Sequence, residues 1–356
     1  MIATRRPRIA DVASAAGVSK TAVSFAFNSP DRLAPDTAVR IREVAESLGY
    51  RPHPVARMLT QRRTMTLGVL TPQALSVIFS NPFFGPFSEG VALVAEESGY
   101  GLHFISPLHG SLARAVGRAT VDGVVAIGLS EHHPEIEQIR QAGLPIVLVD
   151  SSALPDQPSV QVDDEGGARV AAQHLVALGH RDVLVVAVEP QRESAGQVDA
   201  ESVSARRLRG YRAGLAAAGI ELADVRMIVG PASIETGVLA FRQAWDDGLR
   251  PTGVLAMSDA MAVGVLRAAR ELGLSVPADI SVVGFDDIDL AQHTDPLLTT
   301  IHQPIRRKGE EAVRLLLTAV ERRDSNPEHV RLDTRLVVRG STGPAPRPRQ
   351  EVDGVN

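Results

Sequence analysis

Residues 9–28 read IADVASAAGVSKTAVSFAFN and contain two short helical patterns separated by a glycine. In the first pattern the apolar residues recur at the spacing of one helix face: Ile9, Val12, Ala13 and Ala16. Gly17 then suits the positive φ of a helix end, and Ser19 is a favourable N-cap for a second helix from Lys20 to Phe27. Two helices joined by a tight glycine turn predict a helix-turn-helix.

The second helix of such a motif enters the major groove of DNA with its N-terminal residues on base edges. Lys20 and Thr21 are therefore expected to contact bases. Contacts to the DNA backbone are expected from five further polar residues: Arg5, Arg6, Ser19, Ser24 and Arg32.

Positive charge is concentrated in this N-terminal part of the chain. Residues 1–63 contain eleven arginine and lysine residues but only five aspartate and glutamate residues, while the whole chain has a net charge of −5. A basic segment on an acidic body favours binding to a polyanion, although a solvated basic arm would have the same composition. A third helix, predicted from Pro35 to Leu48, completes a DNA-binding headpiece at residues 1–50.

Residues 51–63 separate the headpiece from the rest of the chain. Pro52 and Pro54 stiffen the start of this segment, and residues 55–61 can form about two turns of helix. A helix this short is not stable alone in water, so it would need DNA or a second copy of the chain to order it. A plain linker is the alternative interpretation.

From Thr66 onward, short apolar runs alternate with helical periods. The predicted strands are 67–70, 101–105, 123–127, 146–149, 160–162, 183–188, 226–229, 253–256 and 280–284. Runs that are apolar on both faces are typical of a buried parallel sheet, and such sheets bind ligands beyond the carboxyl ends of their strands. Polar candidates stand directly after predicted strands: Asp150, Ser258, Asp259, Asp286 and Asp287.

Composition excludes several classes of protein. A chain of 356 residues with 44% apolar and 22% charged residues predicts two or three folded, soluble domains. The absence of cysteine excludes a disulfide scaffold, a Cys-ligated zinc site, an iron–sulfur cluster and a cysteine nucleophile. No glycine fingerprint or P-loop follows the first predicted strand, which disfavours a nucleotide-dependent enzyme. Without a long apolar run or an export signal, we expect a cytoplasmic, nucleoid-associated protein that needs no membrane and no cofactor.

A series of longer motifs follows in one order along the chain. In the head these are Asp11-Val12-Ala13, Gly17-Val18-Ser19, Thr21-Ala22-Val23-Ser24, Asn28 and Leu48-Gly49-Tyr50-Arg51-Pro52, followed by Val55-Ala56-Arg57 and Leu59. In the body they include Asn81-Pro82-Phe83-Phe84, Leu178-Gly179-His180, Arg207-Leu208-Arg209-Gly210-Tyr211, Ser258-Asp259, Gly284-Phe285-Asp286-Asp287 and Thr299-Thr300-Ile301-His302-Gln303-Pro304. With this series the chain resembles the LacI/GalR (lactose-repressor) family of bacterial transcription regulators over about residues 9–341.

The resemblance implies a homodimer of a periplasmic-binding-protein-like core, built of two parallel-sheet α/β subdomains, with two headpieces. The N-terminal core subdomain is expected at 64–161 and 292–326, the C-terminal one at 162–291 and 327–342, and a disordered tail at 343–356. The chain is expected to cross between the subdomains near residues 159–163, 291–303 and 325–329. Residues 51–63 are expected to form a hinge helix in which Val55, Ala56 and Leu59 contact DNA, with Leu59 as a minor-groove wedge.

The function that the resemblance implies is regulation of transcription, usually repression, at a pseudo-palindromic operator under the control of a small, sugar-like effector. A periplasmic-type binding protein or a nonenzymatic metabolite sensor with a degenerate pocket is the alternative. The implied effector contacts are Phe83, Phe84, Asp150, Arg207, Ser258 and Asp286. Three positions depart from the common pattern: Ser258 stands where many sugar binders have Asn, Ala232 where an aromatic residue is frequent, and Phe25 where the recognition helix often has Arg. Phe25 therefore predicts altered outer half-site positions in the operator.

Four other features have simpler interpretations than catalysis or metal binding. His132 and His133 are expected in a surface loop and His302 as a buried, hydrogen-bonded residue at a crossover. Asp286 and Asp287 resemble an acid–base pair, but no nucleophile neighbours them in sequence, which favours binding of ligand hydroxyls. The other arginines of the helix that carries Arg207 are expected on a solvated face: Arg206, Arg209 and Arg212. An enzyme on this fold stays open as an alternative and would need a catalytic group at a strand end.

Overall fold

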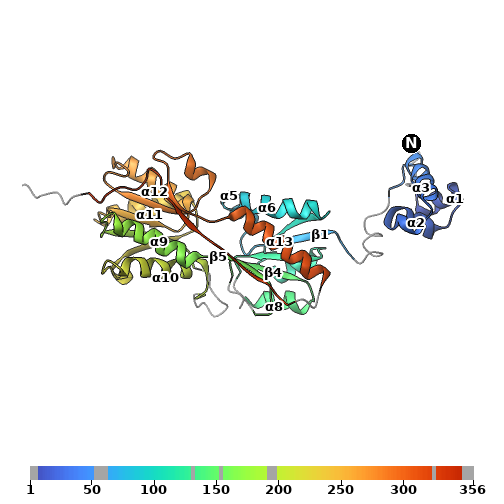
Figure 1. The fold of residues 1–356 in the computed structure, drawn as a ribbon, viewed down its shortest axis with the longest axis horizontal. Coiled ribbons are helices and arrows are strands. Elements are labelled where there is room, and N and C mark those ends of the chain that lie inside the picture. The colour runs from blue at the N-terminus through green and yellow to red at the C-terminus, as the bar shows by residue number, and fades with distance from the viewer. Residues whose placement is uncertain are drawn as a thin grey trace, which may run out of the picture. The chain divides into compact units, whose positions relative to one another are not determined.

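The computed structural model describes residues 7–51, 63–129, 133–151, 155–190, 199–322 and 326–346. The chain divides into two compact units, residues 1–64 and residues 65–356 (Figure 1). We call the first unit the head and the second the core, and we describe each by itself.

Within residues 7–51, the head contains three α-helices and one turn of 3-10 helix. Their bounds are α1 (Ile9–Ala15), α2 (Lys20–Asn28), η1 (Pro30–Arg32) and α3 (Pro35–Ser47). Gly17, between α1 and α2, has a φ of +65°, and the hydroxyl of Ser19 accepts a hydrogen bond of 3.1 Å from the backbone of Ala22. Buried apolar side chains from all three α-helices form one core: Val12, Ala13, Ala16, Val23, Ala26, Ile41 and Ala45. The predicted helix-turn-helix is confirmed.

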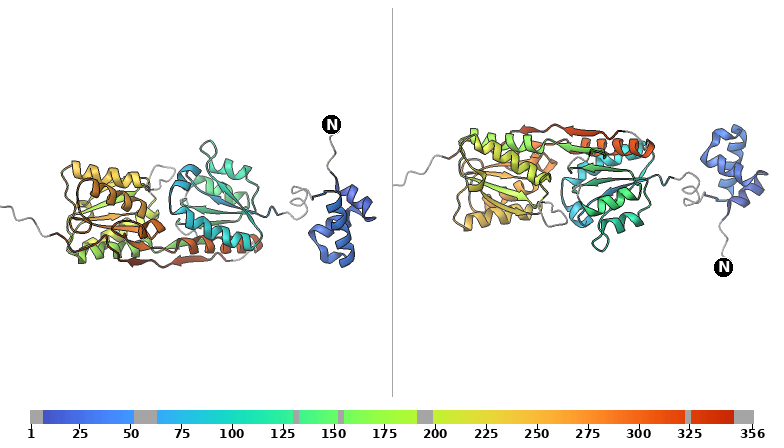
Figure 2. Two further views of the ribbon diagram at one scale, coloured as in Figure 1. Left: turned by 90° about the horizontal axis from the view of Figure 1, so that it is seen from above. Right: turned by 90° about the horizontal axis from the view of Figure 1, so that it is seen from below.

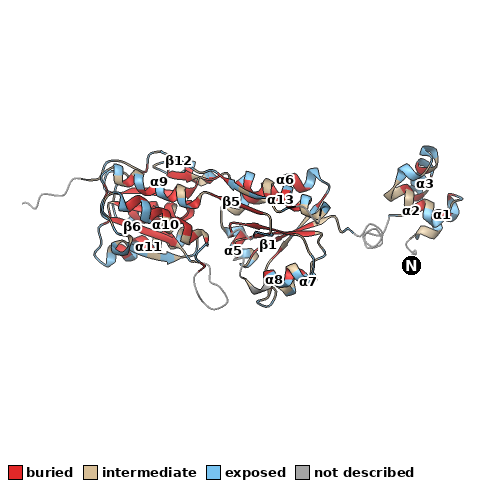
Figure 3. Cartoon of the chain, turned by 60° about the horizontal axis from the view of Figure 1, so that its bottom comes forward, coloured by how far each residue is buried: buried red, intermediate tan, exposed pale blue. Residues whose placement is uncertain are grey.

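The described residues of the core form two six-stranded sheets, each with helices on both faces (Figure 3). The first sheet has the strand order β11-β5-β4-β3-β1-β2, and all its strands are parallel. Its strands are β1 (Thr66–Leu70), β2 (Gly101–Ile105), β3 (Gly123–Ile127), β4 (Ile146–Val149), β5 (Ser159–Val162) and β11 (His329–Leu332). Its helices are α5 (Leu75–Ser80), α6 (Phe84–Glu97), α7 (Leu112–Arg118), α8 (Pro134–Gln141) and α13 (Ile305–Glu321). We call this half of the core subdomain N.

The second sheet has the corresponding order β12-β10-β9-β8-β6-β7, in which only the short edge strand β12 is antiparallel to its neighbour. Its strands are β6 (Val183–Val188), β7 (Arg226–Gly230), β8 (Gly253–Ala256), β9 (Ser281–Asp286), β10 (Thr299–His302) and β12 (Arg335–Val337). Its helices are α9 (Asp164–Ala177), α10 (Val203–Ala216), α11 (Ile234–Asp246) and α12 (Asp259–Glu271), with 3-10 turns η2 (Leu222–Asp224) and η3 (Asp289–Gln292). We call this half subdomain C.

The chain passes between the subdomains three times. It leaves β5 for α9 at Asp163, leaves β10 for α13 at residues 303–304, and passes from β11 to β12 at residues 333–334. Figure 2 shows the last of these connections, coloured red, running along both sheets on one side of the core. Each crossing places the end of a strand in one subdomain next to the first residues of an element in the other.

Two predicted domain boundaries and part of the predicted tail were wrong. The boundary at 292 came too early, because β10 pairs with β9 in subdomain C. The boundary at 327 also came too early, because β11 pairs with β5 in subdomain N. Gly343 and Ala345, predicted to lie in a disordered tail, are hydrogen-bonded to the core, since the carbonyl oxygen of Gly343 lies 3.1 Å from Nε2 of His180 and the backbone N–H of Ala345 donates to Leu178. Residues 347–356 lie outside the described part of the chain.

Helices α6 and α13 pack with their backbones in close contact, and this contact fixes the start of α13. A Cβ atom built on Gly90 of α6 would lie 2.0 Å from the carbonyl oxygen of Arg306, and one on Gly309 of α13 would lie 2.3 Å from that of Phe87. These distances are too short for any side chain, so both positions require glycine.

Gly309→Ala is therefore expected to lower the free energy of unfolding by about 1–3 kcal/mol, because the added methyl group forces the two helices apart. Chemical denaturation of the full chain measures this change. Gly85→Ala in α6 is the matched control, since no heavy atom would lie within 4 Å of its new methyl group. Equal stability of the two variants would contradict the assigned packing.

Among the described residues, no helix combines the length and the apolar character required to cross a membrane.

Candidate functional site

In the head, the described residues predicted to contact DNA lie at the N-cap of α2, along α2 and in η1. Ser19, Lys20, Thr21 and Arg32 are exposed, whereas Ser24 and Phe25 are half-buried. The guanidinium of Arg32 lies 5.3 Å from the centre of the Phe25 ring, and the side-chain amide of Asn28 donates to the hydroxyl of Ser24. Arg5, Arg6, Val55, Ala56 and Leu59 lie outside the described residues.

In the core, two strained residues mark the ends of strands β4 and β9. Asp150 follows β4 with a φ of +57°, and Asp286 ends β9 with a φ of +124°. Residues other than glycine are held in this region only at a cost in free energy, and such strain is frequent at functional sites. Both carboxylates are nevertheless buried and therefore need partners.

Lys308 of α13 and Gln303 connect these two carboxylates. The Lys308 ammonium donates to both side-chain oxygens of Asp150, at 2.7 and 2.9 Å, and to Oε1 of Gln303 at 2.7 Å. Nε2 of Gln303 donates to Oδ1 of Asp286 at 2.6 Å. Because Asp150 belongs to subdomain N and Asp286 to subdomain C, these hydrogen bonds link the two subdomains.

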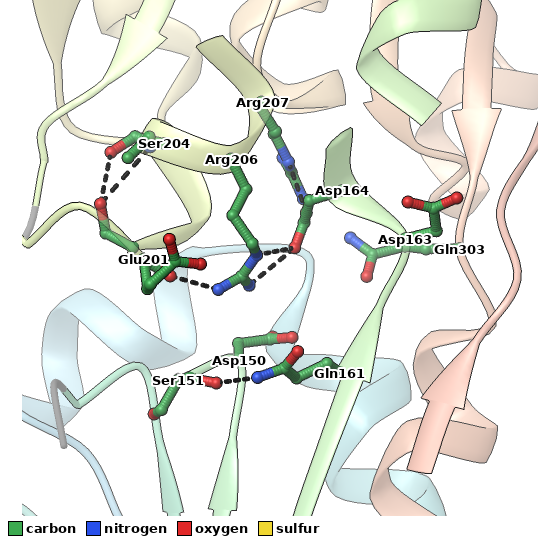
Figure 4. A network of polar contacts seen from close by, with 12 residues as sticks. Asp150, Ser151, Gln161, Asp163, Asp164, Glu201, Ser204, Arg206, Arg207 and Gln303 are labelled. Atoms are coloured by element: carbon green, nitrogen blue, oxygen red, sulfur yellow. Dashed lines mark hydrogen bonds and ion pairs between the residues drawn. The ribbon is translucent and has the colours of Figure 1, made fainter. Parts of the chain in front are cut away.

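Arg207 and Arg206 of α10 extend the connected groups to Asp164 at the start of α9. Arg207 donates through Nε to Oδ1 of Asp164 at 2.9 Å, and its Nη2 lies 3.7 Å from Oδ1 of Asp286. Arg206 donates to Oδ2 of Asp164 through Nε at 3.1 Å and through Nη2 at 2.8 Å. Figure 4 shows Arg206 and Asp164 on one side and Asp150, Ser151 and Gln161 facing them from subdomain N.

We call this set the polar network: Asp150, Asp164, Arg206, Arg207, Asp286, Gln303 and Lys308. It contains three carboxylates and three cations, so its formal charge is zero. Because these groups are buried, each charge has to be compensated inside the site and not by water.

The pKa directions follow from burial and from these contacts. Burial of Asp164 acts to raise its pKa, but the positive charges of Arg207, Arg206 and Lys308 outweigh burial and leave the pKa below its ordinary value. For Asp286, burial outweighs the opposing effects of Arg207 and Gln303 and raises the pKa to about 6. The pKa of the Asp286 carboxyl is thus raised toward neutral pH.

Two predicted effector residues lie beside the network, and a third has another role in the fold. The Lys308 ammonium lies 5.1 Å from the centre of the Phe83 ring, and Phe84 packs edge-on against Phe83 with 5.3 Å between ring centres. Ser258 is the N-cap of α12 and accepts a hydrogen bond of 3.2 Å from the backbone of Met261.

The expectation that Arg206 lies on a solvated face was wrong. Its side chain is 8% exposed, because it turns back from the first turn of α10 onto Asp164. Arg212 is exposed, as expected, and Arg209 is half-exposed with ion pairs to Glu165 and Glu201.

Sequence reasoning also missed Asp164, Gln303 and Lys308 as site residues. One signal was available for Lys308, since it is one of two lysines in the chain and shares its helix face with the apolar residues Ile305, Ala312 and Leu315. A lysine in such a stripe is buried and requires a carboxylate partner. Asp164 carried no comparable signal, because an acidic residue in the first turn of a helix is common for other reasons.

The adjacent aspartates at the end of β9, Asp286 and Asp287, do not share one site. Asp286 belongs to the polar network, whereas the Asp287 carboxylate lies 2.9 Å from Nδ1 of His302 and 2.6 Å from Arg339. His302 is hydrogen-bonded as predicted, but its side chain is 33% exposed and not buried. In the described part of the chain, no group of three or more His, Asp or Glu side chains is arranged to hold a metal ion. Of the predicted loop pair, His132 lies outside the described residues.

Two cavities occur away from the network. One of about 500 Å³ lies between α8 and the end of α13, and one of about 430 Å³ lies beside the first residues of β6 and β7. Neither is lined by a residue of the polar network, and both adjoin the amino-terminal sides of strands, where parallel sheets do not usually bind ligands.

Known protein families match the head and the core separately. Residues 8–53 match the family model described as "Bacterial regulatory proteins, lacI family", and residues 172–342 match a "Periplasmic binding protein-like domain". The chain is 33% identical over 344 residues to the HTH-type transcriptional regulator CelR of Thermobifida fusca, covering 95% of this chain and 98% of the relative. It is 30% identical to catabolite control protein A of Priestia megaterium, covering 94% and 98%.

Solved structures give the same result. The lac repressor dimer bound to operator and an anti-inducer superimposes with a TM-score of 0.80 at 27% identity, covering 95% of this chain and all of the other. The complex of the regulator CelR with cellobiose superimposes with a TM-score of 0.69 at 30% identity, covering 94% and all of the other. These relatives are transcriptional regulators and not enzymes. The chain belongs to the lacI family of bacterial regulatory proteins.

Proposed function

We propose that this protein represses transcription as a homodimer on a pseudo-palindromic operator, and that an uncharged, polyhydroxylated metabolite bound at the polar network controls its affinity for DNA. The observation that carries the proposal is the network itself, which joins the carboxyl ends of strands from both subdomains. A ligand that exchanges hydrogen bonds with these groups changes how the subdomains are held together, which is the requirement for coupling to a distant DNA site.

The charge balance of the network supports an uncharged ligand. Three carboxylates and three cations already compensate one another, so a buried phosphate or ammonium group on the ligand would arrive without a counter-charge. Hydroxyl groups can both donate to the carboxylates and accept from the guanidinium groups. Relatives bind ligands of this class, since the solved complexes contain cellobiose and ribose. We assign Asp150, Arg207 and Asp286 to ligand hydroxyls and Phe83 and Phe84 to the ligand's apolar face.

For the head, we propose that Lys20 and Thr21 contact base edges, because both are exposed in the first turn of α2. We assign contacts with DNA backbone phosphates to Ser19, Ser24 and Arg32. The same contacts are assigned to Arg5 and Arg6 from the sequence alone. The hinge assignment of Val55, Ala56 and Leu59 also remains a proposal from the sequence. Phe25 has no polar group and supports the Arg32 guanidinium, so it is expected to contact a thymine methyl group or sugar.

Lys20→Ala is expected to relax the base preference at the positions that Lys20 contacts, with a loss of about 1–3 kcal/mol on the preferred sequence. Selection from a random duplex library with the full chain first supplies the preferred operator, and binding of single-base variants then measures the preference. Arg40→Ala in α3 is the control for the loss of one exposed positive charge. Equal losses on every DNA sequence would show that Lys20 contacts phosphate and not bases.

A second copy of the chain is proposed to cover apolar side chains on the edges of both sheets. Phe79 of α5 is 61% exposed and packs edge-on against Phe104 of the edge strand β2. On the edge strand β7 of the other sheet, Met227 and Val229 are 42% and 45% exposed. Uncovered strand edges with apolar side chains favour association. A homodimer formed through these edges removes the apolar side chains of both sheets from water.

A further inference from the structure

Lys308 is the most deeply buried charged group of subdomain N among the described residues, with its side chain 1% exposed. All three N–H bonds of its ammonium are used, by Oδ1 and Oδ2 of Asp150 and by Oε1 of Gln303. The ammonium also lies 5.1 Å from the centre of the Phe83 ring. An unbranched apolar side chain of similar length would fill the same space, so the volume of the site does not require a lysine.

The contacts of Gln303 depend on the charge of Lys308. The side-chain amide of Gln303 has an acceptor on one side and a donor on the other. Its oxygen faces the ammonium of Lys308, and its nitrogen faces the carboxylate of Asp286. If the amide were rotated by half a turn, NH₂ would face NH₃⁺ and oxygen would face a carboxylate. Lys308 and Asp286 therefore select one orientation together, and Gln303 lies in the second crossover, between β10 and α13.

We infer that Lys308 is a positioning residue of the effector site, which fixes Gln303 and the second crossover so that Asp150 of subdomain N and Asp286 of subdomain C are presented to one ligand. The inference rests on the proposed function, since it assigns a role within the proposed ligand site. Two separate roles of Lys308 can be told apart. Compensating the charge of Asp150 is structural, whereas ordering the crossover through Gln303 is positioning.

The experiment uses the full chain without ligand and three variants. Lys308→Met removes the ammonium and leaves Asp150 without a partner, so this variant is expected to be strongly destabilised. Lys308→Met combined with Asp150→Asn removes both charges and is expected to recover most of the loss. Arg307→Met is the matched control, because it removes a neighbouring positive charge of α13 whose side chain is 66% exposed.

Hydrogen–deuterium exchange measured by mass spectrometry then compares two segments of each protein. The first contains the backbone amides of the crossover. Among them, the N–H of Gln303 donates to the carbonyl oxygen of Asp286, and the N–H of Ile305 donates to the carbonyl oxygen of Gln303. The second is the buried strand β8, whose exchange reports global unfolding. In the double variant we expect the crossover amides to exchange about tenfold faster relative to β8 than in Arg307→Met.

Two outcomes would overturn the inference. If the crossover of the double variant exchanges as in Arg307→Met, Lys308 only compensates Asp150. If exchange increases equally in the crossover and in β8, Lys308 acts through global stability. Because no ligand is present, neither outcome depends on whether the network binds a metabolite, which is tested separately by ligand titration.

Discussion

Replacing Arg207 by Met is expected to lower the free energy of unfolding by about 3–5 kcal/mol, since it leaves buried carboxylates with too few cations. Arg207 donates to Asp164, lies 3.7 Å from Asp286, and stacks on the ring of Phe285 with its guanidinium carbon 3.6 Å from the ring centre. Asp164 keeps Arg206, but Asp286 loses its arginine and, among the described residues, keeps the side chain of Gln303 as its hydrogen-bond donor. Urea unfolding of the full chain at pH 7 measures the loss.

Arg212→Met is the control for this measurement, because Arg212 lies on the same helix and is exposed. Its effect is expected to stay within about 0.5 kcal/mol, as for most surface substitutions. A second variant, Arg207→Met with Asp286→Asn, removes one charge of each sign and is expected to be more stable than Arg207→Met alone. If Arg207→Met were as stable as Arg212→Met, the guanidinium would not compensate the buried carboxylates.

Asp259→Asn is expected to remove a dependence of stability on pH. Asp259 is fully buried, and burial, with a smaller contribution from the charge of Asp286, raises its pKa from 3.8 to about 8. The folded protein therefore holds a proton that the unfolded chain releases above its ordinary pKa, so this group costs stability as pH rises. The cost begins near pH 4, grows up to about pH 8, and is constant above that pH.

The asparagine variant preserves the contacts of the protonated acid. Oδ2 of Asp259 accepts from the backbone of Ile288 at 2.9 Å, and Oδ1 lies 2.5 Å from the hydroxyl of Thr300. The variant is expected to equal the natural chain near pH 4 and to exceed it by several kcal/mol at pH 8. Denaturant unfolding at pH 4.5, 6 and 8 measures this, with the exposed Asp246→Asn as control. A stability difference that is constant between pH 4.5 and 8 would show that Asp259 is ionised in the folded protein.

The parallel strands could be predicted from the sequence because their apolar runs are buried on both faces. Strands β2, β3, β4, β6 and β8 have the bounds that the sequence predicted. Three strands were absent from the predicted set: β10, β11 and β12. The strands β11 and β12 are edge strands that carry exposed charged residues, such as Arg331 and Arg335. The strand β11 pairs with β5, which lies more than 150 residues away in the chain. Such a distant pairing leaves no pattern in the sequence around β11.

The candidate site was only partly predictable for a related reason. Asp150 and Asp286 were found because polar residues that end apolar strands occupy a known place in this type of sheet. Arg206 was misassigned because helical spacing gives the direction of a side chain from its Cα, while a long arginine in the first turn can fold back onto a neighbouring helix. Gln303 became recognisable only through its two partners, which are brought together by the crossover.

Thermal unfolding of the full chain with matched uncharged and phosphorylated sugars tests the central claim most directly. The panel contains cellobiose, D-ribose, ribose 5-phosphate, D-glucose and glucose 6-phosphate, each added to the natural chain, to Arg207→Lys and to Arg212→Lys. We predict that an uncharged sugar stabilises the natural chain and Arg212→Lys, by about 2.7 kcal/mol at 100 times its dissociation constant, but not Arg207→Lys. Stabilisation by the phosphorylated sugars alone, or equal stabilisation of Arg207→Lys, would contradict an uncharged ligand held by the polar network.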